Sequence, residues 1–232
     1  MTSEETRASG EHAAPGWGRP AGQGTTTLLL RHGATELSAE HRFSGRGDVA
    51  LTKEGIKQAR LAARRLAGQP GVDVIVTSPL RRARHTAEAV AEATGAALIV
   101  DEGLVEADFG AWQGLTFAEA SERWPDEVAA WVASPDAAPP GGESFATVAM
   151  RVLAALDRLV ESHRHARAVV VSHVTPIKTL VCRALLAPPE AMFRMNLDVA
   201  SLTRIDCFDN GSALLRSYND TAHLQERRRR WR

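Results

Sequence analysis

Residues 25–33 read TTTLLLRHG, a short apolar run that leads directly into an arginine, a histidine and a glycine. The apolar part predicts a strand over Thr25–Leu30, so that Arg31-His32-Gly33 follows the carboxyl end of the strand. Open α/β sheets bind their ligands beyond the carboxyl ends of their strands. The stretch therefore predicts a strand of the sheet and a candidate reactive group at its end.

Strand and helix patterns alternate along the rest of the chain, and a hairpin pattern closes it. Further strands are predicted over Val72–Val76, Ala97–Val100 and Ala168–Val171, the last apolar enough to be buried on both faces. Helices are predicted over Thr52–Ala67, Leu80–Ala93, Phe117–Arg123, Glu127–Val132 and Ser144–Ser162, and from Thr175 as N-cap, with Pro176 at the first helical position, to Leu186. Ser201–Phe208 and Ala213–Tyr218 predict a hairpin around Asp209-Asn210-Gly211. The order predicts a three-layer α/β/α fold with a mostly parallel central sheet and a C-terminal hairpin.

The composition bounds the class of protein. The 232 residues hold 28 Lys+Arg and 28 Asp+Glu, a formal net charge of zero that disfavours a nucleic-acid binder held by a basic surface. Residues 1–24 predict a disordered leader, 25–220 one domain, and 221–232 a basic tail. With two cysteines, no signal-peptide pattern and no run near the ~20 apolar residues of a membrane span, a cytoplasmic protein is expected.

Polar residues follow four of the predicted strands. Besides the pair Arg31 and His32, they are Arg81 and Arg82 in the segment Ser78–Ala83, Glu106 and His173. Each alone has an ordinary explanation, such as a hydrogen-bonded loop histidine or the solvated face of a helix. The predicted topology, however, brings all of them to one edge of the sheet, which favours a shared site.

These residue types suit phosphoryl transfer. Guanidinium groups bind phosphate oxygens in a fork, and a neutral imidazole is a nucleophile near neutral pH. A second imidazole, if cationic, adds a donor to the transferring group, and a carboxyl group can protonate the leaving oxygen. No acidic pair or His/Asp cluster has metal-ligand spacing, so neither a metal nor another cofactor is expected.

Several segments, in this order, resemble the histidine phosphatase (phosphoglycerate mutase-like) superfamily. They are LRHGATE (Leu30–Glu36), RFSG (Arg42–Gly45), LTKEGIKQA (Leu51–Ala59), TSPLRRA (Thr77–Ala83), the region from Glu106 to Gly114, GGES (Gly141–Ser144) and Ser172-His173. Within the superfamily, DFGAWQGLTFAEA (Asp108–Ala120), PPGGESF (Pro139–Phe145) and VSHVTPIK (Val171–Lys178) are most similar to two groups. These are the acid phosphatase domain of bifunctional ribonuclease H/acid phosphatase proteins and the α-ribazole phosphatases.

The resemblance implies a role for each matching residue. His32 is the implied nucleophile, which becomes phosphohistidine, while Arg31, Arg82 and His173 line the phosphate pocket. Glu106 is the implied proton donor to the leaving alcohol and then the base for water. At the same site, the resemblance implies contacts to substrate or phosphate from two further residues, Ser44 and Gly45.

The activity implied is that of a metal-independent phosphomonoesterase of the acid phosphatase type. Its expected partner is a small phosphate monoester, with α-ribazole phosphate and a sugar phosphate among the candidates. We expect neither a nucleic-acid nor a membrane partner, and the hairpin edge Ser201–Tyr218 leaves a homodimer open.

Two other functions stay open. A phosphoglycerate mutase uses the same core but must retain the phosphate, and the segment from Glu106 to His173 lacks the longer closing segment of known mutases. A non-catalytic phosphate-binding regulatory module is disfavoured because all five expected groups are present. Four aromatic residues predict either packing or a lid over the leaving-group side: Trp112, Phe117, Trp124 and Trp131.

Overall fold

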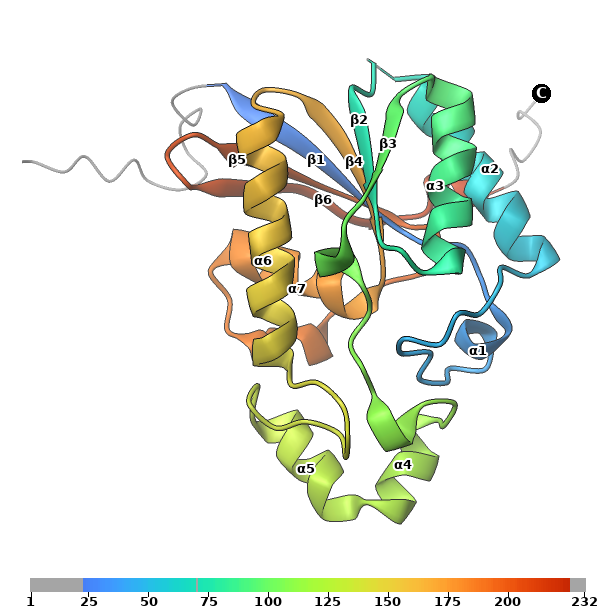
Figure 1. Ribbon diagram of the computed structural model, residues 1–232, viewed down its shortest axis with the longest axis vertical. Coiled ribbons are helices and arrows are strands. Elements are labelled where there is room, and N and C mark those ends of the chain that lie inside the picture. Colours follow the sequence, from blue (N-terminus) through green and yellow to red (C-terminus); the bar gives the residue numbers. More distant parts are fainter. Residues whose placement is uncertain (1–22, 70, 226–232) are drawn as a thin grey trace, which may run out of the picture.

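The computed structural model describes residues 23–69 and 71–225, and most of the leader predicted over 1–24 and of the tail predicted over 221–232 lies outside them. A six-stranded sheet forms the centre of the fold, in the order β3-β2-β4-β1-β5-β6 (Figure 1). The strands are β1 (Gly24–Arg31), β2 (Val74–Thr77), β3 (Ala97–Val100), β4 (Arg167–Ser172), β5 (Leu202–Phe208) and β6 (Ala213–Asp220).

The sheet is mixed, as predicted. Strands β3, β2, β4 and β1 run parallel, while β5 pairs antiparallel with β1 and β6 pairs antiparallel with β5. Between β1 and β4 the register sets Leu30 beside Val171 and Arg31 beside Ser172. The carboxyl ends of the two strands that precede His32 and His173 are therefore level with each other.

Helices cover both faces of this sheet, which confirms the three layers. The α-helices are α1 (Glu36–Ala39), α2 (Lys53–Ala67), α3 (Arg81–Thr94), α4 (Phe117–Arg123), α5 (Pro125–Ala133), α6 (Phe145–Ser162) and α7 (Val174–Leu185). In Figure 1, α2 and α3 lie on one side of the sheet, and α6 and α7 on the other. Leu28 and Leu30 of β1 belong to the buried cluster under α2 and α3, whereas Leu29 belongs to the cluster under α6 and α7.

Local capping signals explain most of the helix ends. Thr52 caps α2 by accepting the N–H of Gly55 at 3.0 Å, and Ser144 caps α6 by accepting that of Thr147 at 3.1 Å. Gly95 ends α3 with φ of 74°, a left-handed conformation that costs glycine little. The starts of α2 and α6 and the end of α3 therefore confirm the helix boundaries predicted from the sequence.

The start of α7 differs from the prediction. The helix begins at Val174, one residue before the predicted N-cap Thr175, and His173 occupies the N-cap position. The N–H groups of Val174 and Thr175 are both donated to the carboxylate of Glu106, at 3.1 and 3.2 Å. Because these donors are satisfied from another segment, the helix does not need a capping side chain of its own. Pro176 still lies in the first turn, where its missing N–H costs nothing.

The segment between β3 and α6 contains the 3₁₀ turns η1 (Glu102–Leu104) and η2 (Gly110–Trp112) and then α4 and α5. Trp112 and Trp131 are buried and meet edge to face, with ring centroids 5.5 Å apart. Trp124 packs against the same core, whereas Phe117 is exposed. Phe43 joins this cluster at 4.6 Å from the ring of Phe109. Packing is therefore the observed role of the three tryptophans, and it anchors the loop around Phe43.

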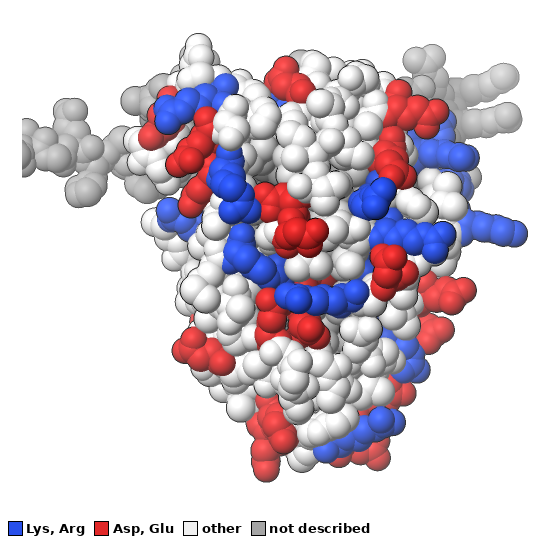
Figure 2. Space-filling model, in the orientation of Figure 1, with Lys and Arg blue, Asp and Glu red and all other residues white. Residues whose placement is uncertain are grey.

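Charge is dispersed over the face shown in Figure 2, where acidic and basic side chains are interspersed. Within the part of the chain that the structure describes, no helix combines the length and apolarity needed to cross a membrane.

Candidate active site

The two histidines lie side by side where β1 and β4 end. Both are buried, and their ring centroids are 5.1 Å apart at an interplanar angle of 56°. The backbone N–H of His32 is donated to the carbonyl of Ser172 at 3.1 Å, which extends the β1–β4 ladder by one step. The parallel pairing of the two strands thus sets the distance between His32 and His173, which lie at one edge of the sheet as predicted.

The hydrogen bonds of His32 define its protonation. Its Nδ1 lies 2.7 Å from the carbonyl oxygen of Gly33, an acceptor only, so Nδ1 carries the proton. Its Nε2 receives the N–H of Arg82 Nε at 3.3 Å and is therefore unprotonated. Burial, together with the positive charges of Arg82 and Arg31, lowers the pKa of His32 well below 6.5. The imidazole is neutral, with a lone pair at Nε2 suited to nucleophilic attack.

A close approach of two backbone segments positions Gly33. A Cβ atom on Gly33 would lie 2.3 Å from the carbonyl oxygen of Gly55, and one on Gly55 would lie 2.1 Å from that of Ala34. Only glycine fits at both places, so the loop after His32 packs directly on the first turn of α2. This contact fixes the carbonyl group that holds the His32 tautomer.

Arg82 is the second residue of α3 and is fully buried beside His32. Its two terminal nitrogens donate to the carbonyl groups of Gly47 and Gly45 at 2.7 and 2.8 Å. Burial lowers the pKa of Arg82, and the negative charge of Glu106 opposes that effect. The side chain is therefore held in one orientation by the loop 44–47.

Arg31 approaches from the end of β1. Its Nη1 donates to the carbonyl of Leu197, while its Nε is buried without a hydrogen-bond partner among the described residues. Burial lowers the pKa of Arg31 to about 10, and the charges of Glu106 and Asp198 counteract part of this effect. Arg31 and Arg82 both lack a carboxylate within ion-pair distance in the described residues, so two largely desolvated cations share the site.

Glu106 is buried and faces the start of α7. Its Oε1 accepts the N–H groups of Ala107 and Thr175 at 2.9 and 3.2 Å, and its Oε2 accepts that of Val174 at 3.1 Å. The positive end of the α7 dipole adds to these contacts. The carboxyl group is thus fixed at the same sheet edge as the two histidines, although no regular element carries it.

His173 contacts a residue that the sequence did not single out for a role. Its Nε2 shares a hydrogen bond of 2.7 Å with the hydroxyl of Ser78, which follows β2, and its Nδ1 is buried without a partner among the described residues. Burial, followed by the charges of Arg82, His32, Arg31 and Arg151, lowers the pKa of His173 well below 6.5. His173 is therefore neutral in this structure, not cationic.

The remaining predicted residues lie in the loop 44–47. Gly45 is buried and contributes its carbonyl to Arg82, whereas Ser44 is half-buried and accepts the N–H of Gly47 at 3.2 Å through its backbone. Arg46 is exposed and forms an ion pair of 3.0 Å with Glu143. The loop thus reaches the site through its backbone.

Sequence reasoning missed two charged residues behind the site. Glu143 and Arg151 form a two-pronged ion pair next to the segment that carries Glu106. Glu143 stands in the segment PPGGESF, which carried the resemblance but received no role. Arg151 lies three residues after Val148 and four before Ala155, which are both buried positions of α6. This spacing places Arg151 on the buried face of the helix, and a charged residue on that face is the sequence signal for its role.

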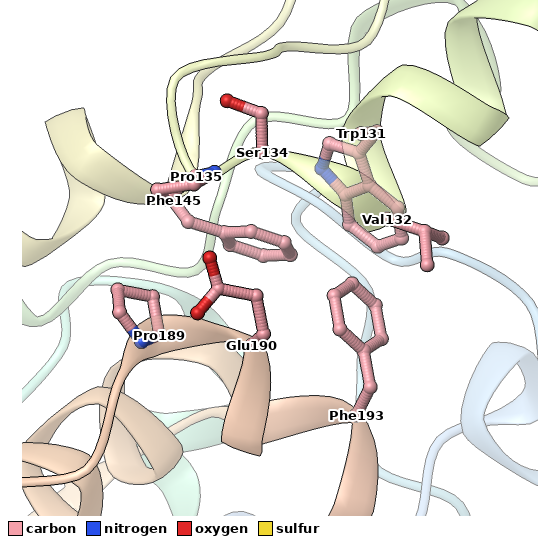
Figure 3. Close-up of a pocket in the computed structure, with 8 residues that line it drawn as sticks. All are labelled: Trp131, Val132, Ser134, Pro135, Phe145, Pro189, Glu190 and Phe193. Atoms are coloured by element: carbon pink, nitrogen blue, oxygen red, sulfur yellow. The ribbon is translucent and has the colours of Figure 1, made fainter.

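A hollow lies away from these groups. It is a shallow, mainly apolar pocket with three aromatic side chains between α5, the start of α6 and the 3₁₀ turn η3 (Pro189–Arg194), and none of the predicted site residues lines it (Figure 3). Its lining residues are Trp131, Val132, Ser134, Pro135, Phe145, Pro189, Glu190 and Phe193. In the described part of the chain, no group of three His, Cys, Asp or Glu side chains is arranged to hold a metal ion.

Comparison with known proteins places this geometry in a family. A model of the histidine phosphatase superfamily (branch 1) matches residues 27–221. The bifunctional protein Rv2228c of Mycobacterium tuberculosis is 46% identical over 211 residues, which are 91% of this chain and 58% of that protein. The chain therefore spans little more than half the length of this relative.

Two further proteins are similar over almost their whole length. Phosphoserine phosphatase 1 of Hydrogenobacter thermophilus is 34% identical over 200 residues, which cover 86% of this chain and 94% of that protein. The solved structure of the mycobacterial glucosyl-3-phosphoglycerate phosphatase Rv2419c with VO3 is 32% identical, with a TM-score of 0.77, and covers 85% of this chain and 100% of that chain. These matches confirm the family resemblance and the fold class predicted from the sequence.

Proposed function

Because the chain belongs to the histidine phosphatase superfamily, we propose that it is a metal-independent phosphomonoesterase of the acid phosphatase type that acts through phosphohistidine. One observation carries the proposal. The unprotonated Nε2 of His32 lies beside two buried cations, Arg31 and Arg82, and within the described residues neither cation has a carboxylate at ion-pair distance. A phosphate monoester supplies a phosphorus atom for His32 Nε2 to attack and a negative charge that balances Arg31 and Arg82.

Substrate binding uses the donors that the protein leaves unpaired. Arg31 Nε and His173 Nδ1 are buried without partners among the described residues. Arg31 Nε–H can donate to a phosphate oxygen, and His173 Nδ1 can do so in the tautomer in which its Nε2 accepts the hydroxyl of Ser78. Arg82 Nε now donates to His32 Nε2, so the same N–H can move to a phosphate oxygen as the substrate enters. This exchange frees the lone pair of His32 at the moment when phosphorus arrives.

The first chemical step forms the phosphoenzyme. The Glu106 carboxylate takes the proton that a monoanionic phosphate ester brings into the site. His32 Nε2 then attacks phosphorus, the bond between phosphorus and the ester oxygen breaks, and Glu106 gives this proton to the departing alkoxide. Hydrogen-bond donors from the two arginines balance the charge on the non-bridging oxygens. The Nδ1–H of His32 stays bonded to the carbonyl of Gly33, which stabilises the positive charge that develops on the ring.

The second step returns the enzyme to its starting state. Glu106 takes a proton from water, the water oxygen attacks phosphorus, and the bond to His32 Nε2 breaks; the inorganic phosphate leaves with that proton, so Glu106 is again a carboxylate. The lowered pKa of His32 keeps its lone pair free in mildly acidic solution, so activity is expected to persist below pH 6.5.

The substrate we propose is a small phosphorylated metabolite, either α-ribazole phosphate or a sugar phosphate. In this proposal the two arginines and the two histidines contact the phosphoryl group of the substrate. The half-buried Lys178 adds a positive charge near Arg31 and Glu106. A panel of phosphorylated metabolites, assayed for phosphate release from pH 5 to 7.5, ranks these candidates against phosphoserine and the phosphoglycerates.

Phosphohistidine trapping tests the reaction itself. The wild-type protein should hydrolyse p-nitrophenyl phosphate in the presence of EDTA. After an alkaline detergent quench, the protein should carry a phosphate label that is stable to base and lost in acid. His32→Ala should show neither activity nor label. Activity that survives in His32→Ala contradicts the proposal.

The same assays separate the alternatives. A phosphoglycerate mutase would interconvert the two phosphoglycerates without net phosphate release, whereas the proposed hydrolase releases phosphate from them or leaves them unchanged. A non-catalytic phosphate-binding module would bind vanadate and form no phosphoenzyme.

A further inference from the structure

Arg151 holds the backbone that carries Glu106. From α6, its Nη1 donates to the carbonyl groups of Gly103 and Val105 at 2.9 and 2.6 Å, and its Nη2 donates to that of Glu106 itself at 3.1 Å. Three carbonyl groups within four residues thus converge on one guanidinium group. The side chain is largely buried, so these hydrogen bonds are shielded from water.

Glu143 completes the contact from the other side. Its carboxylate accepts Arg151 Nε and Nη2 at 3.1 and 3.0 Å, and it also accepts the backbone N–H of Asp108 at 3.0 Å. Burial would raise the pKa of Glu143, but the hydrogen bonds from Arg151 and Asp108 outweigh it and lower the pKa, so the group is ionised. The ion pair therefore holds the chain both before and after Glu106.

The same carboxylate reaches the phosphate side of the site. Arg46 forms a 3.0 Å ion pair with Glu143, and its neighbours Gly45 and Gly47 hold Arg82 through their carbonyl groups. Glu143 thus connects the loop that orients Arg82 with the segment that orients the proton donor.

Glu106 needs such support because its segment has no regular structure. It lies after the turn η1 and before the turn η2, outside every helix and strand. A proton donor must lie within hydrogen-bond reach of the leaving oxygen, and misplacement by about 1 Å can cost ~10²-fold in rate. Contacts from α6 supply the rigidity that the segment lacks.

We propose that Glu143 and Arg151 are positioning residues for Glu106 in proton transfer, an inference that rests on the function proposed above. They touch neither phosphate nor nucleophile. They hold the Glu106 carboxyl group where its proton passes to the ester oxygen as the P–O bond breaks. Their effect should therefore depend on how much the leaving group needs that proton.

Two esters with different leaving groups test this dependence. Dinitrophenolate leaves without protonation, whereas an alkoxide must be protonated. For Arg151→Met, kcat/KM for glycerol phosphate should fall ~10–100-fold, while kcat/KM for 2,4-dinitrophenyl phosphate should change less than ~3-fold. The ratio kcat/KM covers substrate binding and phosphorylation but not the later hydrolysis of phosphohistidine, so a slow hydrolysis step does not affect the comparison.

A matched control lies on the same helix. Arg158 is seven residues beyond Arg151 and also forms a two-pronged pair with a carboxylate, Asp101, but it is exposed, and within the described residues its hydrogen bonds are to this carboxylate and not to the backbone of Glu106. Arg158→Met should leave both esters unchanged. Glu106→Gln removes the proton donor itself. Its loss of kcat/KM for glycerol phosphate relative to 2,4-dinitrophenyl phosphate is therefore the largest that a positioning variant can show.

Conservative variants keep the test decisive if Arg151→Met does not fold. Arg151→Lys and Glu143→Gln remove the fork or the charge but retain most of the volume, and both should show the selective loss. Affinity for vanadate should stay unchanged in Arg151→Lys, because within the described residues Arg151 forms no hydrogen bond with the loop that holds Arg82. An equal loss on both esters, or no loss on the alkyl ester, overturns the positioning role. A wild-type protein that hydrolyses neither ester refutes the proposed function instead.

Discussion

Acidification below pH 6.5 should destabilise the fold through its two active-site histidines. The pKa values of His32 and His173 are lowered well below 6.5 in the folded state, first by burial and then by neighbouring positive charge. In the unfolded chain both return to ~6.5. Between these values the unfolded chain binds protons that the folded chain does not, so the free energy of unfolding rises with pH and is lost as pH falls.

The size of the effect follows from the count of groups. Each fully shifted histidine contributes at most ~1.4 kcal/mol per pH unit, so His32 and His173 together contribute at most ~2.7 kcal/mol. In a domain of this size that lowers Tm by ~5–10 °C for each pH unit below 6.5. The half-buried His223, whose pKa is also lowered by burial, adds a smaller part. Carboxylates such as Asp220, with a pKa of about 2, lose their contribution only at lower pH.

Urea unfolding at pH 7.5, 6.5, 5.5 and 5.0 measures this slope. In His173→Asn the slope below pH 6.5 should fall by about half, whatever the variant does to stability at neutral pH. The control His85→Asn removes an exposed histidine of α3 and should keep the wild-type slope. A wild-type stability that stays flat from pH 7.5 to 5.0, or an unchanged slope in His173→Asn, refutes the reasoning.

Two further predictions concern the guanidinium group of Arg82 and the turn at Gly110. In Arg82→Lys the ammonium group cannot reach the three acceptors of Arg82 at once, so the affinity for vanadate should fall at least ~10-fold. The affinity is measured from the rise in Tm on adding vanadate, and an unchanged affinity contradicts this role of Arg82. Gly110→Ala should cost at least ~2 kcal/mol in urea unfolding, because φ is +49° and its Cβ would lie 2.2 Å from the carbonyl oxygen of Pro140. Gly114→Ala meets no atom within 4 Å at φ of +81° and should cost less; equal losses would argue against the clash.

The layers and the sheet edge could be predicted from the sequence because their signals are local. The run Thr25–Leu30 and the valines before His173 have strand patterns, and parallel strands end at one edge. The glycine after α3 and the threonine before α2 mark helix ends by their own backbone chemistry. Each signal depends on residues within a few positions of one another, which is why the elements were found.

The support behind Glu106 could not be predicted in the same way. Arg151 contacts carbonyl groups 45 to 48 residues earlier in the chain, and no periodic pattern specifies which backbone a guanidinium group will meet. The same limit explains the error at α7. A capping rule considers the residues next to a helix, whereas the donors of Val174 and Thr175 are satisfied by Glu106, 68 and 69 residues away.

The groups that make this site reactive also make it costly to fold. Arg31 and Arg82 are desolvated without a carboxylate partner, and His32 and His173 must stay neutral to remain buried. A bound phosphate reverses each cost, because its negative charge balances the arginines and favours protonation of His173. Besides burial, stability lost to acid and affinity for phosphate therefore share one cause, the positive charges of Arg31 and Arg82. Removing one of these charges should lessen the loss of stability at low pH and weaken phosphate binding together.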